Sequence, residues 1–193
     1  MDDDEWINDH FPNEKRRLHA LGLTNVYWNQ CENGLFWLFV SVSGLSDTVA
    51  WPLVHDLGDV AISNRITAFV DIKKFDPTLK AAIVNVLDVY DTCRLNRNQL
   101  THFYVVPFVD YFKLARAGKK PEKRDGSYFQ SDLTDIRRVV EEITGLDLQR
   151  WVLHAMMQAY DPERPGPWPP TLHVPAPLWT PPPPIQPKRQ RQH

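Results

Sequence analysis

Three polar side chains near the middle of the sequence have the right types for cutting RNA without a metal ion. They are Arg97, Asn98 and His102. Such a cleavage needs a base for the 2′-hydroxyl, stabilisation of the pentacoordinate phosphate and an acid for the leaving 5′-oxygen. A histidine can be base or acid at neutral pH, and a guanidinium is a permanently charged planar fork for phosphoryl oxygens. We therefore assign His102 to proton transfer, Arg97 to the phosphate, and Asn98 to holding the histidine tautomer or the phosphate.

One histidine per chain is fewer than a general acid plus a general base requires. Two chains paired about a two-fold axis would bring two copies of Arg97 and His102 together. Asp91 and Arg94, up to two turns earlier on the same helix, are the candidates to orient these groups. The products would be a 2′,3′-cyclic phosphate and a 5′-hydroxyl. The competing interpretation is a buried polar network of Asp91, Arg97 and Asn98 that only fixes the helix register.

A long helix that ends near Phe103 must position these side chains. Asp76 is a good N-cap, and Pro77 suits the first helical position because no N–H is needed there. Apolar residues then recur at alternating steps of four and three, which is the seam of a helix packed on other helices. Arg97 is the one member that is not apolar in this seam of Leu79, Ile83, Val86, Tyr90, Cys93, Arg97 and Leu100.

The order Arg97-Asn98-Gln99-Leu100-Thr101-His102 resembles the signature of the HEPN superfamily (higher eukaryotes and prokaryotes nucleotide-binding domains). That signature is an Arg, four to six residues and a His near the end of a long helix, commonly with Asn or another polar residue after the Arg. The resemblance covers about residues 25–160 in element order and the short motif in actual residues. It departs at Phe103, where many members carry a small residue.

The resemblance implies a small helical bundle that dimerises and forms a composite site. Many members are metal-independent ribonucleases of toxin–antitoxin, phage-defence and CRISPR systems, and others are inactive binding modules. We therefore expect an endoribonuclease of HEPN type that acts as a homodimer on RNA, with no cofactor or metal, in a toxin or phage-defence role. An antitoxin would then be a further partner. Two alternatives stay open: an inactive HEPN-like module that binds RNA or protein, and an unrelated helical interaction protein.

A basic loop follows the motif helix. The chain from Tyr104 to Phe112 alternates as a strand does, and residues 127–130 would return, so we expect a β-hairpin over about residues 104–130. Clustered cations beside aromatic rings suit single-stranded RNA, with Tyr104 and Tyr128 as the candidate stacking residues. The cations are Lys119, Lys120, Lys123 and Arg124. A plain solvated loop is the alternative.

The rest of the domain is expected to be helical. Thr24 is the predicted N-cap of a helix over residues 25–43, and a short helix then stops at Gly58. Asp59 caps a helix to about Lys74. A last helix begins after Asp132, and Gly145 should kink or divide it. The prediction is a mainly α fold, an HEPN-like bundle of four to five helices over residues 24–160, after an N-terminal extension of residues 1–23.

The C-terminal stretch has a different composition. Residues 161–193 hold twelve of the 17 prolines, so we expect a disordered, polyproline II-like tail with a basic tip at its end. Such a tail either keeps the chain soluble, docks a partner or tethers RNA.

Composition limits what the chain can be. At 193 residues and 42% hydrophobic content it can bury one good core. A net charge of −2 means that RNA binding needs a local basic patch. Cys31 and Cys93 have no metal-like spacing and are expected to be buried free thiols of a cytoplasmic protein. The acidic start is unlike a signal peptide, and the apolar run Leu35 to Leu45 is too short to span a bilayer, so no membrane partner is expected.

Overall fold

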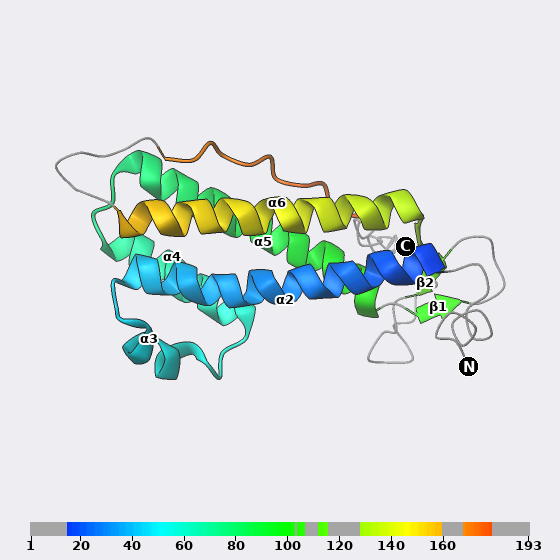
Figure 1. Cartoon of the computed structure of the whole chain (residues 1–193), viewed down its shortest axis with the longest axis horizontal. Coiled ribbons are helices and arrows are strands. Elements are labelled where there is room, and N and C mark those ends of the chain that lie inside the picture. The colour runs from blue at the N-terminus through cyan, green and yellow to red at the C-terminus, as the bar shows by residue number, and fades with distance from the viewer. Residues whose placement is uncertain (1–14, 103, 107–111, 116–127, 160–167, 179–193) are drawn as a thin grey trace, which may run out of the picture.

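Five helices make up most of the computed structural model, which describes residues 15–102, 104–106, 112–115, 128–159 and 168–178. Three of them are long and follow the long axis of the molecule, while the two shorter ones lie at one end (Figure 1). The protein is therefore mainly helical, as predicted. The helices are α2 (Lys15–Ser43), α3 (Asp47–Val54), α4 (Asp59–Ile72), α5 (Pro77–His102) and α6 (Leu133–Gln158).

Helix α2 is the central element because it is apolar on more than one side. It packs most extensively on α6 and next on α4, with further contacts to α3 and α5. Trp28 and Phe36, which lie off the predicted inward stripe, are buried in the core together with Leu35 and Leu38. A helix with apolar residues on two faces is stable only when both faces are covered.

Helix α2 begins at Lys15, ten residues before the predicted start at residue 25, so the expected N-cap at Thr24 is wrong. Thr24 lies inside the helix, fully buried, and its hydroxyl donates to the Ala20 carbonyl at 2.9 Å. A threonine can satisfy its hydroxyl inside a helix in this way, so it need not be a cap. Residues 15–23 belong to the domain, and residues 1–14 lie outside the described part.

Helix α6 runs unbroken through Gly145, so the predicted kink is wrong. Asp132 does cap it: its side chain accepts from the Asp135 N–H at 2.8 Å, and the Asp135 side chain accepts from the Asp132 N–H at 3.2 Å. The apolar stripe of α6 packs on α2 through Ile143 and Leu146 on either side of the glycine. That packing outweighs the cost of about 1 kcal/mol for a glycine inside a helix.

Three short strands follow α5 and pair in the antiparallel order β1-β2-β3. They are β1 (Tyr104–Val106), β2 (Phe112–Ala115) and β3 (Tyr128–Ser131). Tyr104 pairs with Ala115, and Ala115 pairs with Tyr128. The connection that would carry the basic tip, residues 116–127, lies outside the described residues, so the hairpin insertion stays a prediction.

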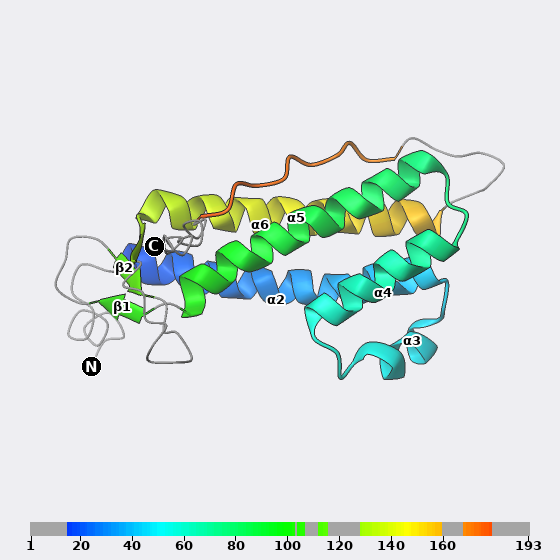
Figure 2. The same cartoon turned by 180° about the vertical axis from the view of Figure 1, so that it is seen from behind.

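Part of the proline-rich stretch is ordered against the bundle, so the prediction of a disordered tail is wrong for residues 168–178. Figure 2 shows this segment running lengthwise beside α5 and α6. Trp168, Leu172 and Leu178 pack on the hydrophobic core. Composition did not predict this contact, because only three large apolar residues lie among many prolines. Their spacing, which composition does not measure, lets all three reach the core. Residues 160–167 and 179–193 lie outside the described part.

Candidate functional site

The seam of α5 is buried as predicted, with one exception. Asp76 begins the helix as expected, since its carboxylate accepts the N–H groups of Thr78 at 3.0 Å and Leu79 at 3.2 Å. Every apolar member of the seam is in the core, whereas Arg97 is only half-buried. The helix continues past it to Leu100, which is buried again. The cation therefore sits at a packed position rather than on a solvated face.

Arg97 contacts a neutral amide and an aromatic ring in the described part of the chain. Its Nη1 donates to the Asn98 side-chain oxygen at 3.0 Å, and its guanidinium carbon lies 6.0 Å from the centre of the Trp28 ring. Its Nε is enclosed and makes no hydrogen bond to any described residue. Among the described residues, no carboxylate lies within ion-pair distance of this guanidinium. A neutral amide and an aromatic face hold the group, so it remains able to bind an anion.

The ring beside Arg97 is itself fixed in place. Trp28 is almost fully buried, and its Nε1 donates to a Glu32 carboxylate oxygen at 2.7 Å. Its other neighbour is Tyr90, whose ring centre is 4.9 Å away at an interplanar angle of 38°. Sequence reasoning did not assign Trp28 to the site. The only signal was an aromatic residue off the inward stripe of its helix.

Asp91 and Arg94 pair with each other instead of with Arg97. Arg94 donates from Nε and Nη2 to one Asp91 oxygen, at 3.1 and 2.5 Å. Its Nε also lies 3.8 Å from a carboxylate oxygen of Asp59, at the start of α4. Two carboxylates thus neutralise Arg94 and connect α5 to α4. Within the described residues, no hydrogen bond or ion pair joins Asp91 or Arg94 to Arg97 or Asn98.

The remaining predicted site residues are only partly described. His102 is the last residue of α5 and Tyr104 the first of β1, so their backbones follow directly after the Arg97 turn. The side chains of both lie outside the described part. The four predicted RNA-binding cations, Lys119, Lys120, Lys123 and Arg124, lie outside it entirely. The structure therefore brings Arg97 and Asn98 together and leaves the other assignments as predictions.

A basic groove lies near the same end of the bundle, where α2 and α6 begin and α5 ends (Figure 1). Its volume is about 310 Å³. Arg16, His19 and Arg137 line it together with Glu141 and three apolar residues. Sequence reasoning missed this groove because its cations come from two helices that are distant in sequence. Three basic side chains against one carboxylate suit a phosphate backbone.

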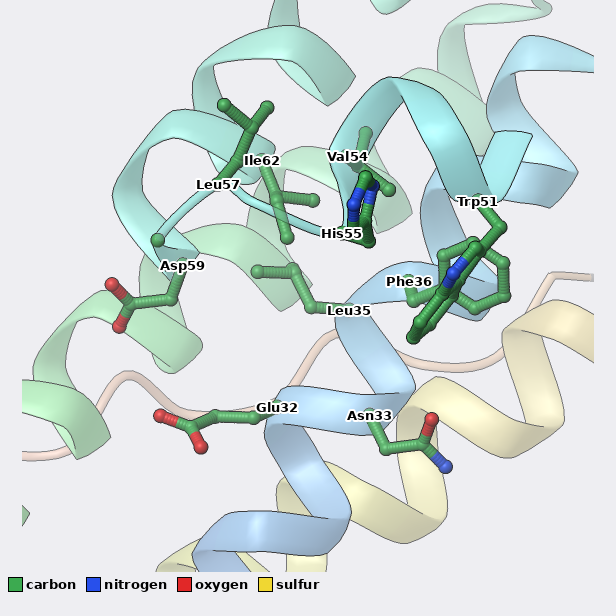
Figure 3. Close-up of a pocket in the computed structure, with 11 residues that line it drawn as sticks. Glu32, Asn33, Leu35, Phe36, Trp51, Val54, His55, Leu57, Asp59 and Ile62 are labelled. Atoms are coloured by element: carbon green, nitrogen blue, oxygen red, sulfur yellow. The ribbon is translucent and has the colours of Figure 1, made fainter. Parts of the chain in front are cut away.

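A second cavity, of about 330 Å³, lies between α2, α3 and α4 (Figure 3). Glu32 and Asp59 lie on one side of it, and the ring of Trp51 meets that of Phe36 edge-on at 5.4 Å on the other. Two carboxylates repel phosphate, so this cavity is not an extension of the Arg97 site. Its lining is Glu32, Asn33, Leu35, Phe36, Trp51, Val54, His55, Leu57, Gly58, Asp59 and Ile62.

A hydrogen bond between a serine and a histidine joins α2 to α6. Ser41 Oγ lies 2.6 Å from His154 Nδ1, and the same hydroxyl donates to the Trp37 carbonyl at 3.0 Å. The direction of the bond between the two side chains depends on the tautomer of His154. Burial, with Arg150 nearby, lowers the pKa of His154. The pair connects the two helices.

The thiols and carboxylates of the described residues form no reactive or metal-binding centre. Cys31 and Cys93 are buried free thiols, as predicted, and burial raises the pKa of Cys93 to about 12. Burial also raises the pKa of Cys31, so neither thiol ionises readily. Within the same residues, no group of three or more His, Cys, Asp or Glu side chains could hold a metal ion.

No single described helix has both the length and the apolar character to cross a membrane; α2 and α3 pass that test only jointly, with a bend of 120° between them. No family model matches the chain, and no curated protein or solved structure is significantly similar to it.

Proposed function

We propose that this chain is a metal-independent endoribonuclease of HEPN type that acts as a homodimer. The observation that supports it is the state of Arg97, which is half-buried beside Trp28, bonded to Asn98, and without a carboxylate partner in the described residues. Holding a cation at a packed position without a counter-charge costs stability. A bound phosphodiester would supply the missing negative charge.

In this proposal His102 accepts the 2′-hydroxyl proton, and the 2′-oxygen attacks the phosphorus. The bond from phosphorus to the 5′-oxygen breaks, and an imidazole from the second chain returns a proton to that oxygen. Arg97 balances the charge that develops on the phosphoryl oxygens, and Asn98 fixes the orientation of Arg97. The products are a 2′,3′-cyclic phosphate and a 5′-hydroxyl. RNA cleavage of this kind would suit a toxin or a phage-defence effector.

Incubation of the full chain with single-stranded RNA in excess EDTA tests the proposal. We expect cleavage to persist in EDTA and to leave 2′,3′-cyclic phosphate ends. It should fall by about 10²-fold or more in Arg97→Ala and in His102→Ala. Arg65→Ala, an exposed arginine on α4, is the matched control and should cleave normally. Cleavage that stops in EDTA, or that survives both substitutions, would rule the proposal out.

The second candidate is a HEPN-like module that binds RNA without cutting it. The ion pairs of Arg94 with Asp91 and with Asp59 favour it, because Asp91 and Arg94 are then engaged away from Arg97 and Asn98. Binding would use Arg97 and the basic groove of Arg16, His19 and Arg137. Fluorescence anisotropy with labelled RNA should then show salt-sensitive binding that weakens in Arg16→Ala and Arg137→Ala, with intact RNA recovered afterwards.

A further inference from the structure

Residues 168–178 lie along α5 and α6, and from Pro169 to Leu178 their burial repeats every three residues. We call the surface of α5 and α6 that this segment covers the α5–α6 groove. Every third residue is turned inward, and the two residues between each pair are exposed. The inward positions are Pro169, Leu172, Pro175 and Leu178. A polyproline II helix has three residues per turn and no internal hydrogen bonds, so this is the pattern of such a helix lying on one edge.

The side chain of Asn85, on α5, binds the main chain of the segment at Leu172. Its side-chain oxygen accepts the Leu172 N–H at 2.7 Å, and its side-chain nitrogen donates to the Leu172 carbonyl at 2.9 Å. The main-chain N–H and the main-chain carbonyl of Leu172 are thus both hydrogen-bonded to the Asn85 side chain. The contact depends on an extended backbone at Leu172 and not on a polar side chain there.

Asn96 repeats the arrangement further along α5. Its oxygen accepts the Leu178 N–H at 2.8 Å, and its nitrogen donates to the Ala176 carbonyl at 3.2 Å. Asn96 has no exposed surface, so its amide cannot hydrogen-bond to bulk water if the bonds to the segment are lost. Arg138 of α6 adds a bond to the same Ala176 carbonyl at 3.3 Å, and Gln149 of α6 adds one to the Pro170 carbonyl at 2.5 Å.

The spacing of the two asparagines matches the length of the extended segment. Asn85 and Asn96 are eleven residues apart, which is about 16 Å along an α-helix. From Leu172, a polyproline II helix covers about 12 Å to Ala176 and about 19 Å to Leu178, the two residues that Asn96 binds. The segment and α5 also run in the same direction. Helix α5 therefore presents two amides at the interval that this conformation requires.

We propose that the α5–α6 groove is a binding site for extended, proline-rich peptides of other proteins with an apolar residue at every third position. Residues 168–178 occupy it here. The bonds from Asn85, Asn96, Arg138 and Gln149 all go to main-chain groups, so over residues 169–178 the site selects a conformation and an apolar spacing. One side-chain bond, from Trp168 Nε1 to Asp76 at 3.0 Å, holds the start of the segment. The chain's own segment is a tethered competitor, which a partner must displace. This inference does not depend on the ribonuclease proposal.

The test uses a labelled peptide of residues 168–178 and the full chain with its own segment released by Leu172→Ala and Leu178→Ala. Fluorescence anisotropy should show saturable binding to this released chain. Binding should weaken by about tenfold or more when Asn85→Ala and Asn96→Ala are added, because each amide contributes two hydrogen bonds. The peptide should also bind the unaltered chain about tenfold or more weakly than it binds the released chain, because residues 168–178 fill the groove of the unaltered chain. A released chain with Asn29→Ala, an exposed asparagine of α2, is the control.

A peptide of the same composition with its leucines moved out of the three-residue register should not bind. Circular dichroism first establishes that the released chain is folded, and a chain with Pro175→Asp provides a second way to release the segment. The proposal is overturned if the peptide fails to bind either folded, released chain, or binds regardless of the asparagines. It is also overturned if the unaltered chain forms dimers that the peptide dissociates, since the occupant would then be a second copy.

Discussion

At Gly34 the backbone of α2 meets a buried arginine of α6. Arg150 is 3% exposed, and its Nη2 pairs with Asp147 at 2.6 Å. Its guanidinium carbon lies 4.5 Å from the centre of the Trp151 ring. A Cβ at Gly34 would lie 1.8 Å from the Arg150 Nε. Because the arginine is held on two sides, it cannot simply swing away, and the glycine is needed for close approach of the two helices.

Gly34→Ala should therefore destabilise the protein even though alanine is the better helix former. We expect the free energy of unfolding to fall by about 1–3 kcal/mol, the usual cost of overfilling a packed site. Urea denaturation followed by circular dichroism measures it. Gly22→Ala on the same helix is the matched control, since a Cβ there meets nothing within 4 Å, and it should add up to about 1 kcal/mol. Equal effects at both glycines would contradict this account of the contact.

Glu142 makes stability depend on pH in an unusual direction for a carboxylate. Burial raises its pKa above the ordinary value of 4.5, even though Arg138 pairs with it at 2.9 Å and acts in the opposite sense. The folded protein thus holds this proton at a pH where the unfolded chain has released it. Stability from this group is present below pH 4.5 and is lost as pH rises through the raised pKa.

Glu142→Gln should remove that dependence. The difference in melting temperature between variant and unaltered protein should grow in favour of the variant as pH rises from 4.5 toward neutrality. Differential scanning fluorimetry over this range measures it. Asp88→Asn, at an exposed position of α5 that does not contribute to the pKa of Glu142, is the control and should leave the profile unchanged. If the melting temperature of the variant rises relative to the unaltered protein as pH falls, then the pKa of Glu142 is not raised by folding.

At the scale of the element, a local sequence signal sets where α6 begins, and long-range packing keeps α6 continuous. Its start is local: Asp132 and Asp135 exchange hydrogen bonds as a capping box, and both residues can be read from the sequence. Its continuity through Gly145 is not local, because it depends on the surface that α2 presents.

Asp132→Ala should cost about 1 kcal/mol of stability, the typical loss for an N-cap carboxylate. The first turn of α6 should also exchange its amide hydrogens faster, which hydrogen–deuterium exchange can resolve. Thr134→Ala, an exposed position in the same turn, separates a lost cap from a change in helix propensity. If both variants have the same stability, the capping box contributes nothing measurable.

At the scale of the whole molecule, residues 168–178 bind α5 and α6 together along their length. The bonds to Leu172 and Leu178 come from residues 87 and 82 positions earlier in the chain. The segment therefore closes the fold at long range, at a seam where α5 and α6 pack against each other.

The amides of Leu172 and Leu178 should be protected from hydrogen exchange, although they lie outside any helix or strand. Asn85→Ala should remove the protection at Leu172, and Asn96→Ala that at Leu178, because each amide is bonded to its own asparagine. NMR-detected exchange gives this resolution. Asn29→Ala should leave both amides protected. Fast exchange of both amides in the unaltered protein would mean that the segment is not held in solution.

The sequence alone determined the motif helix, because its signals are local. The cap at Asp76, the apolar seam and the odd position of Arg97 all follow from periodicity within one helix. The mainly helical fold and the cap at Asp132 were predictable for the same reason. The prediction for α4 was one residue off, because Gly58 is its N-cap and Asp59, the predicted cap, is its first residue. The early start of α2 was missed because a threonine can be a cap or a buried helical residue, and only its surroundings decide.

Tertiary structure alone decided what lies around Arg97 and beside α5. Trp28 reaches Arg97 from another helix, and Asn85 finds its partner at Leu172, far along the chain. The sequence shows which side chains can form hydrogen bonds, but it offers each of these side chains several possible partners. Packing chose among these partners, because a buried polar group must be satisfied by whatever the fold brings within reach.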